Sequence, residues 1–376
     1  MKPSGPFRYD IVGSFLRPDY LKQARADYEA NKITKDQLQE VEDEAIKELV
    51  KQQQEIGLKA VTDGEFRRKY WHFDFISELN GITTYQYDTG GSFNGAMGKM
   101  DAYYVSGELS FNPHHSFLNH FKFMKSIAGD SVVKQTIPGP NMILNSGVIS
   151  SSYYRESPYY KNLDEVIEAI AKTYQEAILA FYQAGCRYLQ LDDTAWGTLF
   201  NPKSIEAFEA LGYTIPELCE KFTKVTQKSL ENRPQDMTIT IHVCRGNFKS
   251  NWLYEGTYDN IASALFEKVD VDGFFLEFDD ERSGSFEPLQ KVSGDKIVVL
   301  GLITSKTPTL EDEEFIINRI KEASQYIPLE RLCLSPQCGF ASTQEGNTLT
   351  SIEQWEKVKL VKRAVSYTHL TLPTKA

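Results

Sequence analysis

The stretch TITIHVCRGN, residues 238–247, combines the pattern of a buried strand with two side chains that bind metals. Side chains two positions apart point to the same face of a strand, so His242 and Cys244 would leave this strand side by side. An imidazole nitrogen and a thiolate sulfur are both ligands for Zn²⁺. A buried imidazole beside a small buried thiol would give the same pattern without any metal, and the pair alone does not separate these alternatives.

Two later strand-like segments carry further candidate ligands where their apolar runs end. Glu277 lies near the end of GFFLEFDD, and Cys338 lies just past the apolar part of LCLSPQCGF. Together with His242 and Cys244 they form a mixed nitrogen, sulfur and oxygen set that suits Zn²⁺. These four residues are therefore our candidate metal ligands.

Strand-like and helical segments alternate along the chain, which predicts an α/β fold. Parallel strands that are covered on both faces are short, apolar and β-branched, and the later segments fit this description. Eight such strands with helices between them indicate a (β/α)₈ TIM barrel, in which all carboxyl ends of the strands converge on one face. The expected strands are residues 7–15, 58–66, 132–140, 186–196, 237–246, 271–280, 296–304 and 332–340, and the expected helices include 34–56, 162–184, 204–231, 258–268, 310–325 and 351–365.

We predict one catalytic barrel over residues 1–365, with a long insertion after the second strand. Residues 70–132 are too many for an ordinary loop, and two alternating segments within them predict a hairpin over the pocket mouth. Four histidines lie here without metal-ligand spacing, and we interpret them as surface or packing residues: His72, His114, His115 and His120. Residues 366–376 continue no pattern, so we expect a loose or non-native tail.

Composition limits the class of protein. The chain has 376 residues, 41% hydrophobic content and a formal charge of −11, which argue for a soluble protein and against nucleic acid or anionic membranes as partners. No apolar run approaches the length of a membrane span, and the first residues do not resemble a secretory signal. Five scattered cysteines do not form a disulfide framework. We expect a cytoplasmic protein, with an oligomer possible.

Polar groups also follow the other strands. The turn at Val12, Gly13 and Ser14 could bring backbone N–H groups to an anion, or could be a plain turn. Carboxylates end the second expected strand at Glu65 and the fourth at Asp192, where they would face the catalytic rim of a barrel or lie in a solvated loop.

The motifs VGSF, DGEF, QLDD, HVC, LEFD and SPQCGF occur in this order. This set resembles the C-terminal catalytic barrel of cobalamin-independent methionine synthase, most closely its short single-barrel forms, over roughly residues 8–365. The resemblance implies one zinc ion held by His242, Cys244, Glu277 and Cys338. It also implies that homocysteine is bound by the backbone of Val12, Gly13 and Ser14 and by the carboxylates of Glu65 and Asp192, with Asp63 and Asp193 as adjacent alternatives.

The sequence departs from this family at two positions. Ser146 stands where the long enzymes have a Trp of the folate site, and Lys306 stands where they have a proton-relay His. We therefore assign Lys306 a catalytic role as charge partner or proton source. The N-terminal half of the long enzymes is also missing, so the methyl donor, possibly a methyl folate, is not fixed. Lys134, Lys161 and Lys306 are candidates for a basic rim.

These features predict a zinc-dependent methyltransferase that moves a methyl group to the thiol of homocysteine and forms methionine. An alkyltransferase acting on another thiol or alkyl donor is the alternative enzyme. A zinc-stabilised binding protein without turnover is an alternative from another class. A zinc-free decarboxylase on the same kind of barrel would have no use for the four ligands.

Overall fold

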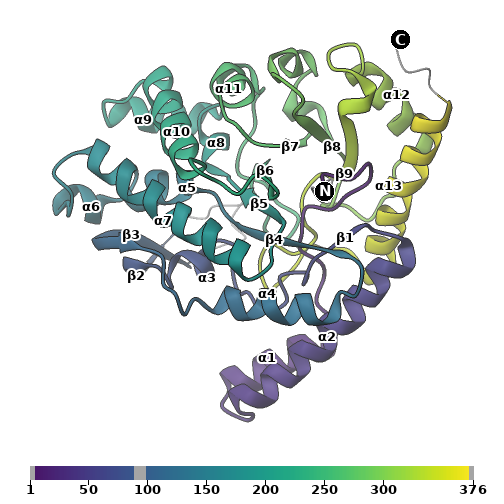
Figure 1. The fold of residues 1–376 in the computed structure, drawn as a ribbon, viewed down its shortest axis with the longest axis horizontal. Coiled ribbons are helices and arrows are strands. Elements are labelled where there is room, and N and C mark those ends of the chain that lie inside the picture. Colours follow the sequence, from purple (N-terminus) through teal and green to yellow (C-terminus); the bar gives the residue numbers. More distant parts are fainter. Residues whose placement is uncertain (1–4, 89–98, 372–376) are drawn as a thin grey trace.

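A curved sheet of seven parallel strands forms the centre of the computed structural model, which describes residues 5–88 and 99–371 (Figure 1). Almost every residue of these strands is buried, as expected for a parallel sheet covered by helices. The strands lie side by side in the order β1 (Ala60–Val61), β4 (Val132–Pro138), β5 (Tyr188–Asp192), β6 (Thr238–Val243), β7 (Gly273–Glu277), β8 (Ile297–Ile303) and β9 (Leu332–Pro336).

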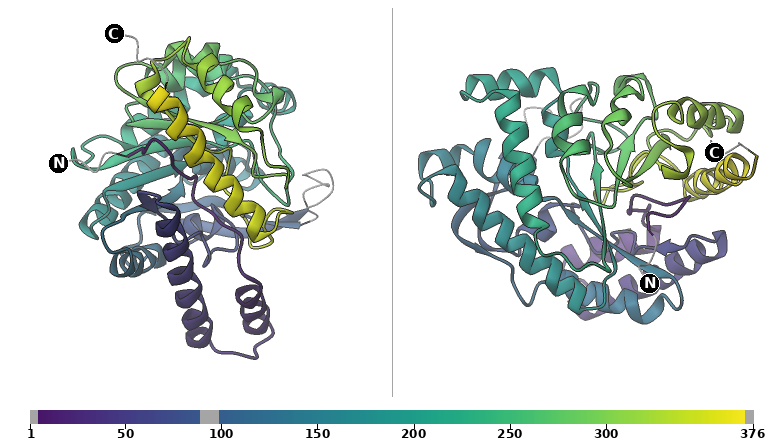
Figure 2. Two further views of the ribbon diagram at one scale, coloured as in Figure 1. Left: turned by 90° about the vertical axis from the view of Figure 1, so that its right-hand side faces the viewer. Right: turned by 45° about the horizontal axis from the view of Figure 1, so that its top comes forward.

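Helices cover the outside of this sheet, and α1 and α2 project from it as a pair (Figure 2). Helix α2 begins at a capping box, because Thr34 and Gln37 bond reciprocally to each other's backbone N–H groups. Its end at Gly57 is confirmed by a left-handed φ of 93°. The main helices are α1 (Asp19–Glu29), α2 (Lys35–Ile56), α4 (Ser116–Ile127), α7 (Leu163–Gln183), α9 (Pro202–Ala210), α10 (Ile215–Ser229), α12 (Glu313–Ala323) and α13 (Ser351–Thr371).

The predicted first strand over residues 7–15 is not formed. Within the described residues this segment makes only isolated parallel bridges, from Tyr9 to Leu334 beside β9 and from Ser14 to Gly64 after β1. Three successive carbonyl groups of this segment accept hydrogen bonds from side chains instead of from a neighbouring strand. The donors are Lys134 Nζ to Ile11 at 2.5 Å, Gln190 Nε2 to Val12 at 2.8 Å and Thr62 Oγ1 to Gly13 at 2.6 Å.

Lys134 therefore does not belong to a basic rim, contrary to our expectation. Its side chain is fully buried, and its Nζ lies 3.4 Å from Asp10 Oδ1 and 3.8 Å from the centre of the Phe275 ring. Tyr188 donates a second hydrogen bond to Asp10 at 2.9 Å. Lys134 thus fastens the N-terminal segment to the interior of the sheet.

Two predicted boundaries are wrong. The helix expected over residues 204–231 is divided into α9 and α10, because Gly212 adopts a φ of 84° and Thr214 begins a new helix with a capping box to Glu217. The tail expected from residue 366 instead continues α13 through Thr371. Residues 372–376 lie outside the described part of the chain.

Residues 70–132, which we predict to be an insertion, contain the predicted hairpin. Strands β2 (Asn80–Asp88) and β3 (Lys99–Ser110) pair antiparallel, α3 (Phe73–Ile76) precedes them, and α4 follows and packs on β4. The packing interpretation of the histidines is confirmed for His72 and His115, which are buried against aromatic rings, while His114 is exposed. The position of the hairpin over the pocket mouth stays a prediction.

None of the helices in the described ranges is both long and apolar enough to cross a membrane.

The buried ion pair of Lys134 and Asp10 gives a test of the fold. In Lys134→Met, the carboxylate of Asp10 keeps its burial and loses its cation, so the free energy of unfolding should fall by about 3–5 kcal/mol. Urea denaturation followed by circular dichroism measures this. The matched control is Lys224→Met, which breaks an exposed pair with Asp164 and should leave the unfolding midpoint nearly unchanged. Equal midpoints for the two variants would contradict the anchoring role of Lys134.

Candidate metal centre and pocket

The four predicted metal ligands meet at one end of the sheet. His242 lies in β6 and Cys244 follows it, Glu277 ends β7, and Cys338 follows β9. One ligand atom from each residue lies within 4.8 Å of the others, and all four residues are buried. The Sγ atoms of Cys244 and Cys338 are 3.7 Å apart although 94 positions separate them in the sequence.

The orientation of His242 fits a metal ligand. Its Nδ1 lies 3.2 Å from the carbonyl oxygen of Phe275, and because a carbonyl can only accept, Nδ1 carries the proton. The other ring nitrogen, Nε2, is buried and has no hydrogen-bond partner among the described residues. A buried bare nitrogen of this kind, oriented by a carbonyl behind the ring, is the arrangement that metal-binding histidines use.

Glu277 is held by donors on both sides. Its Oε1 accepts the backbone N–H of Arg245 at 2.8 Å, and its Oε2 accepts the side-chain amide of Gln337 at 2.7 Å. Each carboxylate oxygen keeps a free lone pair, so Glu277 can still bind a cation. Sequence reasoning missed Gln337, although its place directly before Cys338 was the available signal.

The two thiols and the imidazole shift one another's pKa values. Contact with Cys244 and with His242 holds the pKa of the Cys338 thiol well below its usual range, whereas contact with Cys338 and burial raise the pKa of Cys244. Burial acts to lower the pKa of His242, but the proximity of Cys338 together with the charges of Asp192 and Glu277 outweighs burial, and the pKa is raised. Several mutually repelling groups at one buried point are stabilised by a cation, so the residues fit Zn²⁺.

The predicted substrate residues line the same pocket as the metal ligands. Its wall includes Val12, Ser14, Glu65 and Asp192 together with His242, Cys244 and Cys338. Gly13 lies behind this wall, where a Cβ would come within 2.8 Å of the methyl group of Thr136. The adjacent alternatives Asp63 and Asp193 do not line the pocket. Asp63 instead accepts the backbone N–H of Glu65 at 2.9 Å.

The two pocket carboxylates differ in their partners. Glu65 lies 3.3 Å from Arg68 and accepts a hydrogen bond from Thr136 at 3.0 Å, yet burial still raises its pKa. Asp192 accepts only the neutral amide of Gln190 at 2.7 Å among its described hydrogen bonds, and burial raises its pKa to about 7. The negative charge of Asp192 is therefore compensated less by neighbouring groups than that of Glu65. Arg68, which the sequence analysis missed, lies one turn from Glu65.

The free space between these groups is small. It amounts to about 20 Å³, which is room for an ion or one water but not for an amino acid. Trp71 and Ser342 are the only described lining residues that are not fully buried, and the N–H of Trp71 donates to the carbonyl of Ser342 at 3.0 Å. Sequence patterns gave no signal for either residue.

Lys306 lies close to the metal ligands without lining the pocket. Its charge contributes to lowering the pKa of Glu277 and of Cys338, although burial dominates at Glu277 and contact with Cys244 dominates at Cys338. Its Nζ is buried, and no described residue accepts a hydrogen bond from it. Ser146, the other position of departure, lies in a π-helical turn, Ile143–Ile149, that follows β4.

Residues 9–359 match the family model described as the cobalamin-independent synthase catalytic domain. The chain belongs to this cobalamin-independent synthase family. Because the match extends from the N-terminal segment into α13, the family covers both the metal centre and the pocket.

Relatives of this cobalamin-independent synthase chain span most of its length. The uncharacterized protein YxjG of Bacillus subtilis (strain 168) is 46% identical over 358 residues, which are 95% of this chain and 93% of the relative. A protein of Saccharolobus solfataricus named methionine synthase is 23% identical over 334 residues, covering 88% of this chain and 86% of the relative.

Solved structures of the family agree with the fold. A Listeria monocytogenes protein, provisionally assigned as a vitamin-B12-independent methionine synthase, has a TM-score of 0.75 and 40% identity and covers 96% of this chain and 98% of its own. A B12-independent methionine synthase from Shewanella sp. W3-18-1, solved with selenomethionine, has a TM-score of 0.71 at 18% identity and covers 97% and 98%. At that identity the second likeness concerns the fold alone.

Metal analysis tests the four-ligand centre. The purified protein should contain about one Zn²⁺ per chain, and His242→Ala or Cys338→Ser should lose most of it because the shell becomes incomplete. The matched control is Cys333→Ser, which changes another buried cysteine in β9 whose thiol pKa burial raises to about 12. Full zinc content in both ligand variants, measured by mass spectrometry of the metal, would contradict the assignment of these residues as zinc ligands.

Proposed function

We propose that this chain is a zinc-dependent methyltransferase that moves a methyl group to the thiol of homocysteine and releases methionine. The observation that carries the proposal is the shared wall of the pocket, in which Cys244 and Cys338 lie beside Asp192 and Glu65. A thiol-activating centre and two carboxylates at one place suit a substrate that has both a thiol and an ammonium group. The family match supports the same class of reaction.

His242, Cys244, Glu277 and Cys338 would hold the zinc ion. When bound there, Zn²⁺ would act as a Lewis acid that lowers the pKa of an acceptor thiol from its ordinary value of about 8.5, so that the sulfur reacts as a thiolate. Arg245 and Gln337 keep Glu277 in position through their hydrogen bonds. The buried Lys306 is our proposed charge partner or proton source for the reaction, because its ammonium lies close to these anions.

Asp192 and Glu65 would bind the ammonium of homocysteine. A buried carboxylate without a cation is costly, and an ammonium group supplied by the substrate removes that cost. Arg68 already compensates part of the charge of Glu65, so Asp192 should contribute more to ammonium binding. Since the present space is about 20 Å³, homocysteine requires the side of the pocket at Trp71 and Ser342 to open.

Acceptor recognition provides a test with two variants. Asp192→Asn should lower kcat/KM for homocysteine by an amount that corresponds to about 1.5–3 kcal/mol of lost stabilisation, the scale of a charged hydrogen bond. Glu65→Gln should lower kcat/KM by an equal or smaller amount. Zinc content should stay unchanged in both variants. As a control on the substrate, 4-mercaptobutanoate lacks the amino group and should be a poor acceptor for the unmodified protein. Equal kcat/KM values for homocysteine and this analogue would rule out the ammonium-binding role.

The methyl donor is a separate question. A folate with a polyglutamate tail brings many negative charges to a chain of net charge −11, and Ser146 replaces the family's Trp. Lys134 is buried with Asp10 and cannot supply a basic rim. We therefore expect methyltetrahydrofolate to be a poor donor and a smaller or less anionic methyl compound to be preferred.

A donor panel at fixed homocysteine tests this expectation through kcat/KM. The panel contains methyl folates with one and several glutamates, methylcobalamin, and small methylated thiols and sulfonium compounds. A polyglutamylated methyl folate that outperforms every other donor would overturn the expectation while leaving the acceptor assignment intact.

A further inference from the structure

The buried guanidinium of Arg17 joins two loops that line the pocket at the metal centre. The Glu65 loop, residues 62–72, follows β1 and carries the pocket carboxylate, and the Cys338 loop, residues 337–344, follows β9 and carries a metal ligand. Arg17 is 3% exposed and is not among the described residues of the pocket wall. The separation of the carboxylate from the metal ligand therefore depends on how the two loops are held together.

Every described hydrogen bond of the Arg17 side chain goes to a backbone carbonyl group. Its Nη2 donates to Glu65 at 2.5 Å and to Arg68 at 2.8 Å, and its Nη1 donates to Thr343 at 3.0 Å. Two longer contacts, of 3.4 Å and 3.5 Å, reach one further carbonyl on each loop. The planar fork of a guanidinium can serve both loops at once, whereas the single nitrogen of a lysine cannot.

Arg17 carries its charge without a carboxylate in hydrogen-bond contact among the described residues. Burial, with a smaller contribution from the charge of Arg25, lowers its pKa to about 10, so the side chain stays protonated at neutral pH. Burying a cation in this way is costly, and an apolar residue would fill the same space without that cost. The contacts with the carbonyl groups of the two loops are what the arginine adds.

The backbone of Glu65 adopts a conformation that has to be held in place. Its φ is 60°, and that of Gly64 is 66°, in the left-handed region that residues with a side chain rarely adopt. Asp63 accepts the N–H of Glu65 at 2.9 Å, and Arg17 binds its carbonyl group. Both peptide groups of Glu65 are thus fixed in the conformation in which this residue lines the pocket.

The two loops also bond directly to each other. The N–H of Trp71 donates to the carbonyl of Ser342 at 3.0 Å, and the N–H of Gln344 donates to the carbonyl of Lys69 at 2.9 Å. The contacts of Arg17 lie closer to Glu65 along the chain than Trp71 does. Opening of the pocket at Trp71 therefore need not break the contacts of Arg17.

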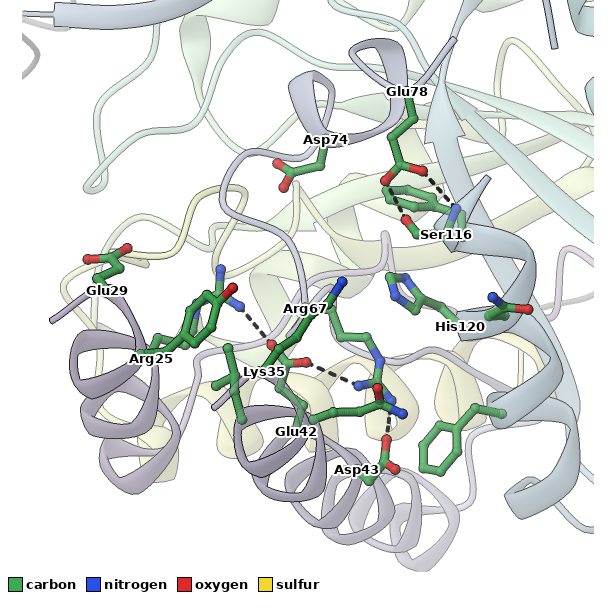
Figure 3. A pocket seen from close by; sticks show the side chains of 16 residues that line it. Arg25, Glu29, Lys35, Glu42, Asp43, Arg67, Asp74, Glu78, Ser116 and His120 are labelled. Carbon is green, nitrogen blue, oxygen red and sulfur yellow. Dashed lines mark hydrogen bonds and ion pairs between the residues drawn. The ribbon is translucent and has the colours of Figure 1, made fainter. Parts of the chain in front are cut away.

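A separate set of contacts holds the outer side of the Glu65 loop. Figure 3 shows Arg25 and Arg67 directed at the carboxylate of Glu42 in α2, at 3.0 Å and 3.1 Å, and Arg67 also pairs with Asp43. Arg67 lines an outer cavity and is not among the described residues of the pocket at the metal centre. It is therefore a matched control for Arg17, as a second buried arginine that holds the same loop from its other side.

We propose that Arg17 is a positioning residue that fixes the span between the Glu65 carboxylate and Cys338, and that this span determines which amino-acid thiol the chain accepts. An acceptor has to place its ammonium at Glu65 and Asp192 while its sulfur lies at the metal centre. Homocysteine has one methylene more than cysteine between these two groups, so a fixed span suits only one of them. The proposal rests on the proposed function, because it requires an acceptor that bridges both places.

Calorimetric titration of the zinc-loaded full chain with homocysteine and with cysteine tests this without a methyl donor. In the unmodified protein, we expect homocysteine to bind at least tenfold more tightly. Arg17→Lys keeps the charge and loses the planar fork, so it should raise the Kd for homocysteine tenfold or more and reduce the preference over cysteine to threefold or less. Arg67→Met should leave both Kd values within twofold, even where its unfolding midpoint falls.

Each failure has its own signature. Cysteine that binds the unmodified protein as tightly as homocysteine contradicts a fixed span, whatever the stability of the variants. An unchanged Kd and preference in folded Arg17→Lys overturns the role of Arg17 and leaves the proposed function intact. Equal losses of preference in Arg17→Lys and Arg67→Met mean general loosening of the loop and also overturn it. If neither thiol binds the unmodified protein, the proposed function fails and the positioning role fails with it.

Discussion

The buried carboxylate of Glu277 connects the parts of the chain that form the metal centre. Its two oxygens accept the N–H of Arg245, directly after Cys244, and the amide of Gln337, directly before Cys338. One side chain at the end of β7 therefore contacts both the backbone that follows β6 and the side chain of Gln337 that follows β9. A charge at this depth is tolerated only when it is hydrogen-bonded and balanced, so a bound cation would stabilise the centre.

A second set of contacts brings the N-terminal segment to this centre. The side chains of Lys134, Gln190 and Thr62 bind three successive carbonyl groups of that segment, in place of the ladder of a regular strand. This places Val12 and Ser14 in the pocket wall. Gly339 completes the contact, because a Cβ at that position would lie 1.9 Å from the Oγ of Ser14. The pocket wall thus combines the N-terminal segment with residues at the ends of β5 and β6 and after β9.

The sequence predicted the parts of this account that depend on local pattern. Ligands two residues apart in a strand and ligands at the ends of parallel strands follow from strand geometry, and His242, Cys244, Glu277 and Cys338 do converge. Long-range partners could not be predicted in this way, because neither the donor from Lys134 to the carbonyl of Ile11 nor the pair of Arg68 and Glu65 leaves a spacing signal. The same reason explains why residues 7–15 do not form the first strand that the pattern predicts.

The central claim is that the four ligands hold zinc at the place where the thiol of homocysteine reacts. X-ray absorption at the zinc edge measures this most directly, because it counts sulfur atoms around the metal. We expect two sulfur neighbours in the zinc-loaded protein, from Cys244 and Cys338, and three after homocysteine is added. A count of two that stays unchanged at saturating homocysteine would contradict the account, since the zinc would then be structural and remote from the acceptor.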